Sequence, residues 1–264
     1  MELLSKLTPA ETHLLLHKSK AELKDLMKYT YMDLLFKKVL APKKVIRQNQ
    51  NGGKIRTYNY ILTGINFNEH KALSHELIYL TPYTKNKSIK ILFQHLISMA
   101  FENSKGKRRY IQKNLLSSPQ LQHYVESSLF HKLFGIIQLN KEGKLARIKI
   151  QESINILEKD FHEILISDEE RALKILHSIK GNIFLLNNFD FELLKKVDRQ
   201  LFKEIKKTEK LSDYEFYDFE DYGSFDSYED SFDSNYDSSE ASFSSDSGCS
   251  SGGCSGCGGC GGCS

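Results

Sequence analysis

Residues 7–40 read LTPAETHLLLHKSKAELKDLMKYTYMDLLFKKVL, and this stretch decides the fold class because it predicts two successive helices. The sequence Thr-Pro-Ala-Glu at 8–11 provides a hydroxyl cap, a proline for the first helical position and a carboxylate at the third, which together satisfy free N–H groups at a helix start. Ser19 offers a second cap, and the apolar residues of 23–35 recur at steps of three to four. Both helices should therefore bury one face.

The segment after Pro42 changes to the pattern of a β-hairpin. Residues 44–48 and 54–61 read as strands, and Asn-Gly-Gly at 51–53 supplies a turn in which glycine accepts positive φ angles at little cost. Helix, helix and hairpin is the order of a winged-helix module. We therefore assign residues 1–68 to a first winged-helix-like unit.

Residues 69–150 give a similar order with different residues, and we assign them to a second, looser winged-helix-like unit. Its hairpin is expected from strand patterns at 136–139 and 144–150, on either side of Asn-Lys-Glu-Gly. Before this hairpin, helices are expected at 69–80, 88–103 and 118–135.

Residues 151–207 read as a helical cap over these units, because their apolar residues recur at helical spacing. Residues 208–264 form a tail. Between Asp213 and Asp246 it alternates Asp, Ser and aromatic residues, and we find no apolar period that would offset the entropy of ordering. The predicted fold is mainly α, with tandem winged-helix-like units, small β-hairpins, a helical C-terminal cap and a disordered tail. The helices of the cap are expected at 152–165, 167–181 and 191–207.

The charge of the chain divides near Lys210. Residues 211–264 contain twelve of the 34 acidic residues and no Lys or Arg. The remaining 22 acids are set against all 37 Lys and Arg, so the body carries about +15 and the tail about −12. A tail of this length can reach back over the basic body.

The basic surface of the body is the main candidate for partner binding. Its groups can neutralise phosphates, so nucleic acid is one candidate partner. A protein partner is favoured, because lysine-rich faces are common on helical proteins and this body brings its own polyanion. The candidate residues are Lys43, Lys44, Arg47, Lys54 and Arg56 of the first hairpin, with Lys105, Lys107, Arg108 and Arg109 of a later loop.

All five cysteines lie at the end of the tail, at Cys249, Cys254, Cys257, Cys260 and Cys263. Their three CxxC steps match the spacing of ligands for zinc, copper(I) or an iron–sulfur cluster. Glycine and serine fill every gap, however, and supply no apolar anchor for a zinc knuckle. The alternatives are a zinc or copper site, an enzymatically modified segment, and a low-complexity end without a specific ligand.

The sequence shows no catalytic constellation. Asn51 to Lys54 is followed by strand-forming residues rather than a helix, so it does not read as a phosphate loop. His13 and His17 stand four residues apart, but no third metal ligand is placed nearby. The body has no cysteine, residues 1–20 have no apolar core of signal-peptide length, and no apolar run is long enough to span a bilayer. We expect a soluble cytoplasmic protein that is not an enzyme.

The chain also resembles a family of uncharacterised bacterial proteins, defined by an N-terminal Leu-x-Pro-Ala-Glu-type domain and a Gly/Cys-rich C-terminal tail. The residues that carry the resemblance are Leu7-Thr8-Pro9-Ala10-Glu11, the amphipathic run to Val39-Leu40, and the glycine/cysteine end. The resemblance covers about the first 150 residues and the tail. It implies no activity and no catalytic residue. Many members carry membrane helices, which this sequence lacks.

Two functional hypotheses follow. In the first, the basic body binds a macromolecular partner without catalysis, and the acidic tail screens that surface or exchanges with the partner. In the second, the cysteine-rich end is the functional segment, which binds metal or is modified. The body then serves to recognise the modifying or metal-delivering enzyme.

Overall fold

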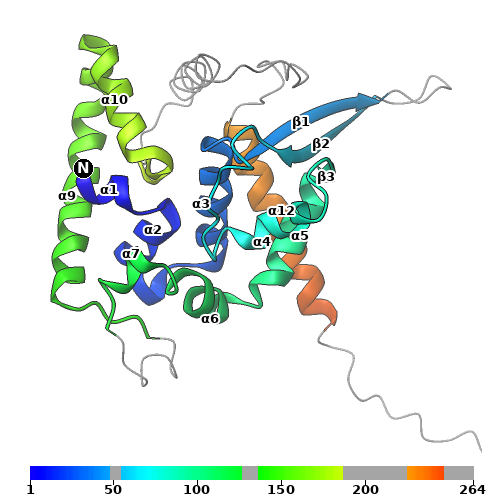
Figure 1. The fold of residues 1–264 in the computed structure, drawn as a ribbon, viewed down its shortest axis with the longest axis horizontal. Helices are drawn as coiled ribbons and strands as arrows, with labels where there is room; N and C mark the ends of the chain where they lie inside the picture. Colours follow the sequence, from blue (N-terminus) through cyan, green and yellow to red (C-terminus); the bar gives the residue numbers. More distant parts are fainter. Residues whose placement is uncertain (48–54, 127–135, 187–224, 247–264) are drawn as a thin grey trace, which may run out of the picture.

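The computed structural model describes residues 1–47, 55–126, 136–186 and 225–246. Helices dominate these residues, and a three-stranded antiparallel sheet projects from one end of the helical part (Figure 1). The prediction of a mainly α protein is confirmed.

The elements follow one another in chain order. The first are α1 (Glu2–Lys6), α2 (Pro9–His17), the 3-10 helix η1 (Lys18–Lys20), α3 (Leu23–Phe36), β1 (Leu40–Arg47) and β2 (Arg56–Thr63). Next come α4 (Leu77–Thr84), β3 (Ile91–Leu92), α5 (Phe93–Ser104), α6 (Lys107–Arg109), the π-helix η2 (Tyr110–Leu115) and α7 (Pro119–Gln122). The last are α9 (Lys141–Ser167), α10 (Glu169–Ile179), the 3-10 helix η3 (Lys180–Leu185) and α12 (Phe225–Asp246).

The start of α2 has the predicted capping box. The Thr8 hydroxyl accepts a hydrogen bond from the Glu11 amide, and the Glu11 carboxylate accepts one from the Thr8 amide at 2.7 Å. The second predicted cap, at Ser19, is wrong. Helix α3 begins after Glu22 without a side-chain cap, and the Ser19 hydroxyl instead accepts a hydrogen bond from the Ile137 amide at 3.0 Å.

The first hairpin is confirmed. Strand β1 pairs with β2 from Leu40↔Thr63 to Arg47↔Arg56, and β2 pairs with the short β3 on its other side. Pro42 therefore lies inside β1, an edge strand, where a missing amide is tolerated. The turn predicted at 51–53 lies outside the described residues.

The second hairpin is wrong, because residues 141–150 belong to the long helix α9. Asn140, read as a turn residue, is the helix cap: its side-chain oxygen accepts a hydrogen bond from the Gly143 amide at 2.7 Å. A Cβ atom at Gly143 would lie 2.0 Å from the Tyr124 carbonyl oxygen, so glycine serves close packing here rather than a turn. The second unit therefore does not end in a hairpin.

Other predicted helices agree with the structure in part. The segments expected at 69–80 and 88–103 appear as α4 and α5, each beginning later, and α4 continues through Pro82. Residues 152–165 lie in α9, and the helix expected up to Gly181 is α10. In the helix predicted at 118–135, residues 119–122 form α7, and residues 127–135 lie outside the described residues. The helix expected at 191–207 also lies outside them.

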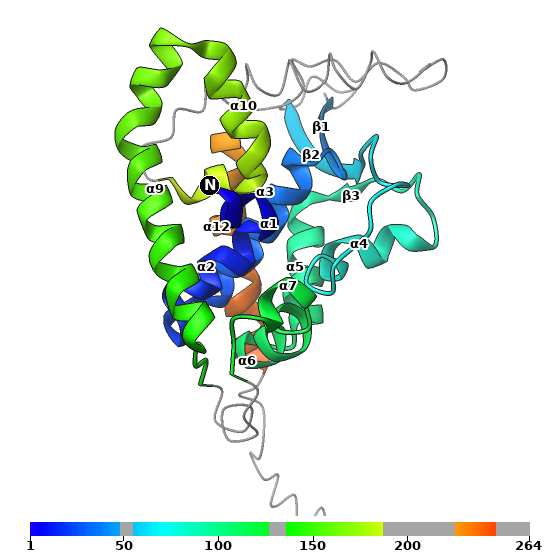
Figure 2. The same ribbon diagram turned by 60° about the vertical axis from the view of Figure 1, so that its left-hand side comes forward.

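The disordered tail is wrong for residues 225–246, which form α12. Figures 1 and 2 show α12 lying alongside α3 and α5, and it contacts both. Phe232 and Tyr236 of this helix are buried in the same apolar cluster as the N-terminal helices. That cluster takes members from all four predicted segments of the chain, so those segments share one core. Residues 247–264 lie outside the described residues.

One buried side chain ties the end of the helical cap to the first two helices. Asn182 in η3 donates hydrogen bonds to the carbonyl oxygens of Leu4 and Leu7, at 2.6 and 2.7 Å. Both carbonyls lie near helix ends, where intrahelical donors are missing. The contact holds η3 against α1 and the start of α2.

The Asn182→Ala substitution should lower the free energy of unfolding by about 2 kcal/mol, because it leaves two buried carbonyl groups without a donor. Urea denaturation followed by circular dichroism measures the change. Asn103→Ala, at an exposed position of α5, is the matched control and should change stability by less than about 0.5 kcal/mol. Equal effects of the two substitutions would contradict this role.

Candidate functional site

Helix α12 covers a surface of the body that the sequence did not single out. We call this surface the α12 docking surface and define it by Lys24, Lys28 and Tyr31 of α3 and Phe101 of α5. It is formed by residues more than 120 positions away from α12 in the sequence. Both aromatic packing and ion pairs hold α12 on it.

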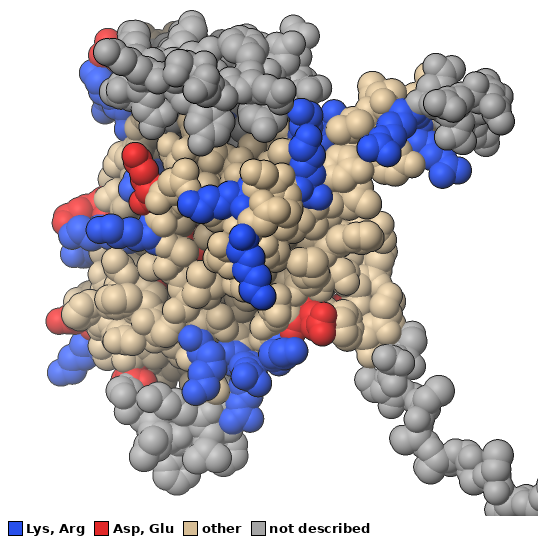
Figure 3. Space-filling model, turned by 45° about the vertical axis from the view of Figure 1, so that its right-hand side comes forward, with Lys and Arg blue, Asp and Glu red and all other residues tan. Residues whose placement is uncertain are grey.

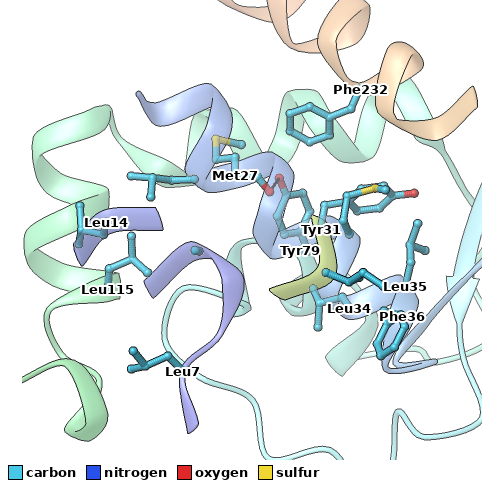
Figure 4. Close-up of a cluster of buried hydrophobic side chains, with 14 of the residues drawn as sticks. Leu7, Leu14, Met27, Tyr31, Leu34, Leu35, Phe36, Tyr79, Leu115 and Phe232 are labelled. Carbon is cyan, nitrogen blue, oxygen red and sulfur yellow. Dashed lines mark hydrogen bonds between the residues drawn. The ribbon is translucent and has the colours of Figure 1, made fainter. Parts of the chain in front are cut away.

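The aromatic contacts lie at the centre of the docking surface. The Phe232 ring is fully buried and stacks on Tyr31 with the ring centroids 6.0 Å apart. Figure 4 shows this ring pointing from α12 toward Met27 and Tyr31. Further along α12, Phe101 packs edge-on against Tyr236 at 5.2 Å and also contacts Phe243 at 5.5 Å. Such buried aromatic side chains contribute most to interface energetics.

The ion pairs lie beside the aromatic contacts. Lys24 donates hydrogen bonds to both carboxylate oxygens of Asp237, at 2.9 and 3.1 Å, and also lies 3.8 Å from Asp233. Lys28 lies 3.5 Å from the other oxygen of Asp233. The acidic segment therefore contacts the basic body through Lys24 and Lys28, two residues absent from the predicted set.

A signal for this contact is present in the sequence. The aromatic residues Phe232, Tyr236 and Phe243 follow one another at steps of four and seven, which places them on one face of a helix. The acid- and serine-rich composition outweighed this pattern in the prediction of disorder. The aromatic spacing, rather than the composition, identifies the docking face.

The predicted basic residues of the first hairpin lie along its two paired strands. Lys43, Lys44 and Arg47 are on β1 and Arg56 is on β2, directly opposite Arg47. The Arg47 guanidinium lies 5.9 Å from the centroid of the Tyr58 ring, within the range of a cation–π contact. Lys54 lies outside the described residues.

The second predicted basic group follows α5. Lys105 has a left-handed backbone conformation that ends α5, and Lys107, Arg108 and Arg109 form the short helix α6. Lys107 is paired with Glu22 at 3.0 Å. The structure does not bring this group together with the hairpin: Figures 1 and 2 place α6 and the hairpin at opposite ends of the molecule, and Figure 3 shows basic side chains at both ends with others scattered between them.

A buried ionic cluster lies beneath α3 and connects it to the segment before α4. Lys37 pairs with Asp33 at 2.5 Å and with Glu76 at 3.4 Å, and the other Glu76 oxygen is 2.8 Å from a His70 ring nitrogen. Burial alone raises the pKa of Glu76, but the hydrogen bond with His70 and the charge of Lys37 outweigh it and lower the pKa to about 2. Glu76 is thus an ionised, fully engaged carboxylate that stabilises the fold rather than one that exchanges protons near neutral pH.

The histidine pair considered in the sequence is a packing pair. The rings of His13 and His17 lie 4.3 Å apart, and His13 also contacts Tyr29. In the part of the chain that the structure describes, no group of three His, Cys, Asp or Glu side chains is arranged to hold a metal ion. The five cysteines with their predicted zinc or copper site lie outside the described residues.

A surface cavity of about 520 Å³ lies between η1 and the first half of α9. Its walls combine cationic, amide and aliphatic side chains with the carboxylate of Glu152. The lining residues are Lys18, Ile137, Gln138, Leu139, Lys144, Arg147, Ile148, Gln151 and Glu152.

Comparisons of the chain with protein-family models, curated proteins and solved structures found no match. None of the helices in the described ranges has the length and apolar character needed to cross a bilayer.

The Phe232→Ala substitution should lower the free energy of unfolding by about 3 kcal/mol, because it removes a fully buried aromatic side chain from the core. Guanidinium denaturation measures this loss. Phe243→Ala is the matched control, since Phe243 is 42% exposed at the end of the same helix and should cost less than about 1 kcal/mol. If both variants unfold like the wild type, α12 is not docked in solution.

The stability of the protein should fall as the pH is lowered from 7 to 5. Burial, together with the charges of His17 and Lys28, lowers the pKa of His13 to about 4, whereas an unfolded histidine has a pKa of about 6.5. The unfolded state therefore binds more protons between these values, so the contribution of neutral His13 is complete above pH 6.5 and is lost toward pH 4, by roughly 2 kcal/mol at pH 5.

Thermal unfolding at pH 7 and pH 5 tests this dependence on His13. The His13→Gln variant keeps a polar side chain that does not titrate and should lose less stability than the wild type over the same interval. A variant that loses as much as the wild type would show that another group, such as the buried His75 with its lowered pKa, dominates.

Proposed function

We propose that this chain is a non-enzymatic interaction protein whose basic helical body binds a macromolecular partner and whose acidic C-terminal segment modulates that binding through α12. The observation that carries the proposal is the seating of α12, an acidic and aromatic helix, on Lys24 and Lys28 of the body. We favour a protein partner, with nucleic acid as the second candidate.

The composition of α12 favours a helix that forms only when it is docked. Eight of its 22 residues are Ser and five are Asp, both weak helix formers, and Ala241 is its single alanine. Its serine hydroxyls bond to carbonyl oxygens four residues earlier, as at Ser238 and Ser242, which favours bent and weakened helices. Packing of Phe232 and Tyr236 therefore stabilises the helix, and loss of the docking surface should unfold it.

The docked helix also indicates the chemistry of a competing partner. Its contacts come from an aromatic residue followed by an aspartate, repeated four residues later: Phe232-Asp233 and Tyr236-Asp237. A partner helix with the same pattern would present aromatic anchors to α3 and α5 and carboxylates to the two lysines. This is binding of an amphipathic helix by its i and i+4 side chains.

The basic group of residues 105–109 extends this surface at one end. It follows directly on α5, whose Phe101 contacts Phe243 near the end of α12. A partner longer than α12 would therefore reach Arg108 and Arg109 after it has passed Phe101. The second predicted contact group consists of Lys43, Lys44, Arg47, Lys54 and Arg56. Its members on β1 and β2 lie at the far end of the molecule, and Lys54 lies outside the described residues.

Other predictions remain part of this proposal. The first unit keeps the helix, helix, hairpin order of a winged-helix module in α2, α3 and the β1–β2 pair. The likeness to uncharacterised bacterial proteins with a Leu-x-Pro-Ala-Glu-type domain adds no activity to it. A zinc- or copper-binding role of the terminal cysteines and a cytoplasmic location also stay predictions.

The proposal is tested with a fluorescent peptide of residues 225–246 and the full-length chain. In the wild type, α12 occupies the docking surface and the peptide should bind weakly. The Phe232→Ala/Tyr236→Ala variant loses both aromatic anchors of its own helix, so its docking surface is open to the peptide. It should bind the peptide at least about tenfold more tightly than the wild type does, because the binding free energy of one buried aromatic side chain corresponds to about that factor. Fluorescence anisotropy measures both affinities.

Two controls accompany this experiment. Ser242→Ala, at an exposed position of the same helix, should leave the peptide excluded. Asp233→Lys/Asp237→Lys opens the surface by charge repulsion from Lys24 and Lys28 and keeps the proposal testable if the alanine variant fails to fold. Equal peptide binding by the wild type and by every folded variant would overturn the proposal.

A further inference from the structure

Helix α9 is apolar on two opposite faces. Its inner face packs against α1, α2 and α10. The buried residues of that face are Ala146, Ile150, Ile154, Leu157 and Phe161. On the opposite side, four large aliphatic side chains face solvent: Leu145, Ile148, Ile156 and Ile166, with exposures of 58%, 55%, 59% and 75%. Figures 1 and 2 show α9 along the edge of the molecule in both views.

The four exposed aliphatic residues belong to one continuous stripe. At 3.6 residues per turn, Glu152, Lys159 and Glu163 fall on the same line and fill the gaps between them. We call this line the outer stripe of α9; it consists of Leu145, Ile148, Glu152, Ile156, Lys159, Glu163 and Ile166. Its members are separated by steps of three and four residues, the spacing of a helix that pairs with another helix.

The charges of α9 are divided between its two halves. Residues 141–150 carry four basic side chains and one acid, a net charge of +3, whereas residues 151–167 carry four acids and one lysine, a net charge of −3. This order opposes the helix macrodipole, which favours acids near the N-terminus and bases near the C-terminus. The distribution therefore does not stabilise α9 itself, but it complements an identical helix that runs in the opposite direction.

We propose that the outer stripe is a homodimer interface in which α9 packs antiparallel against α9 of a second copy. A two-fold axis between Asn155 and Ile156 brings Leu145 of one copy opposite Ile166 of the other. The same axis brings Glu152 opposite Lys159 of the second copy, and symmetry repeats each contact. Glu152 and Lys159 are both exposed, and neither forms an ion pair within the described residues.

The arrangement favours a second copy over other occupants. About one axis, Leu145 meets Ile166, Glu152 meets Lys159, and the basic half of α9 meets the acidic half of the second copy, a symmetry that an unrelated partner does not require. A 27-residue helix extends over about 40 Å, so a pair of such helices forms a long but narrow contact. An interface of this kind belongs to the weaker class of dimers, with a dissociation constant of about the micromolar range.

Sedimentation velocity on the full-length chain from about 1 to about 100 µM tests the proposal, because the range brackets a micromolar constant. The wild type should shift from monomer to dimer. Glu152→Lys and Lys159→Glu each convert two attractive contacts into two repulsive ones and should weaken dimerisation about tenfold. The Glu152→Lys/Lys159→Glu double variant restores opposite charges across the axis and should dimerise within about threefold of the wild type.

Lys71→Glu, an exposed charge reversal away from α9, is the matched control and should dimerise like the wild type. Circular dichroism and thermal unfolding establish that each variant is folded; because the substitutions lie on the solvent-facing side of α9, they should leave both unchanged. A wild type that stays monomeric over the whole range overturns the proposal. The proposal is also overturned if the single charge reversals do not weaken dimerisation, or if the double variant dimerises as weakly as the single variants. The result is independent of whether α12 is docked.

Discussion

Helix α3 is buried on nearly every side, and the rest of the structure is arranged to keep it so. Ten of its 14 residues are buried, which is the pattern of a helix in the middle of a core rather than at its surface. Helix α2, η3, the start of β1 and α12 each contact it. Because α12 is one of these neighbours, the acidic C-terminal segment is part of the core and also a candidate regulator of binding.

Burial of α3 also explains why charges lie inside the protein. Asp33 and Lys37 are one helical turn apart, and Glu76 and His70 complete a network that compensates the loss of water around them. The backbone is adapted to this network: a Cβ atom at Gly181 would lie 2.3 Å from an Asp33 carboxylate oxygen. Removing one side chain of this network would leave the opposite charge buried without a partner. The network therefore fixes the position of the segment before α4 relative to α3.

Local signals in the sequence predicted local structure, and non-local contacts limited the rest. The Thr8–Glu11 capping box and the β1–β2 hairpin were predicted because the residues that specify them are neighbours. Asn140 suits a turn and a helix cap equally well, and only its neighbours in space decide in favour of the cap. Likewise, α12 is stabilised by Tyr31 and Lys24, about 200 residues earlier, so composition alone could not reveal it. The basic candidates were chosen from sequence clusters, but the fold places the described members of the two clusters at opposite ends of the molecule.

The seating of Phe232 on Tyr31 has a consequence for synthesis of the chain. At about 5 to 20 residues per second, a ribosome adds the 201 residues from one to the other in roughly 10 to 40 seconds. During that interval the nascent N-terminal helices cannot complete their core, and the apolar side of α3 stays open to chaperones and to other nascent chains. The last step in forming this core therefore waits until Phe232 has been added, whatever the N-terminal helices achieve earlier.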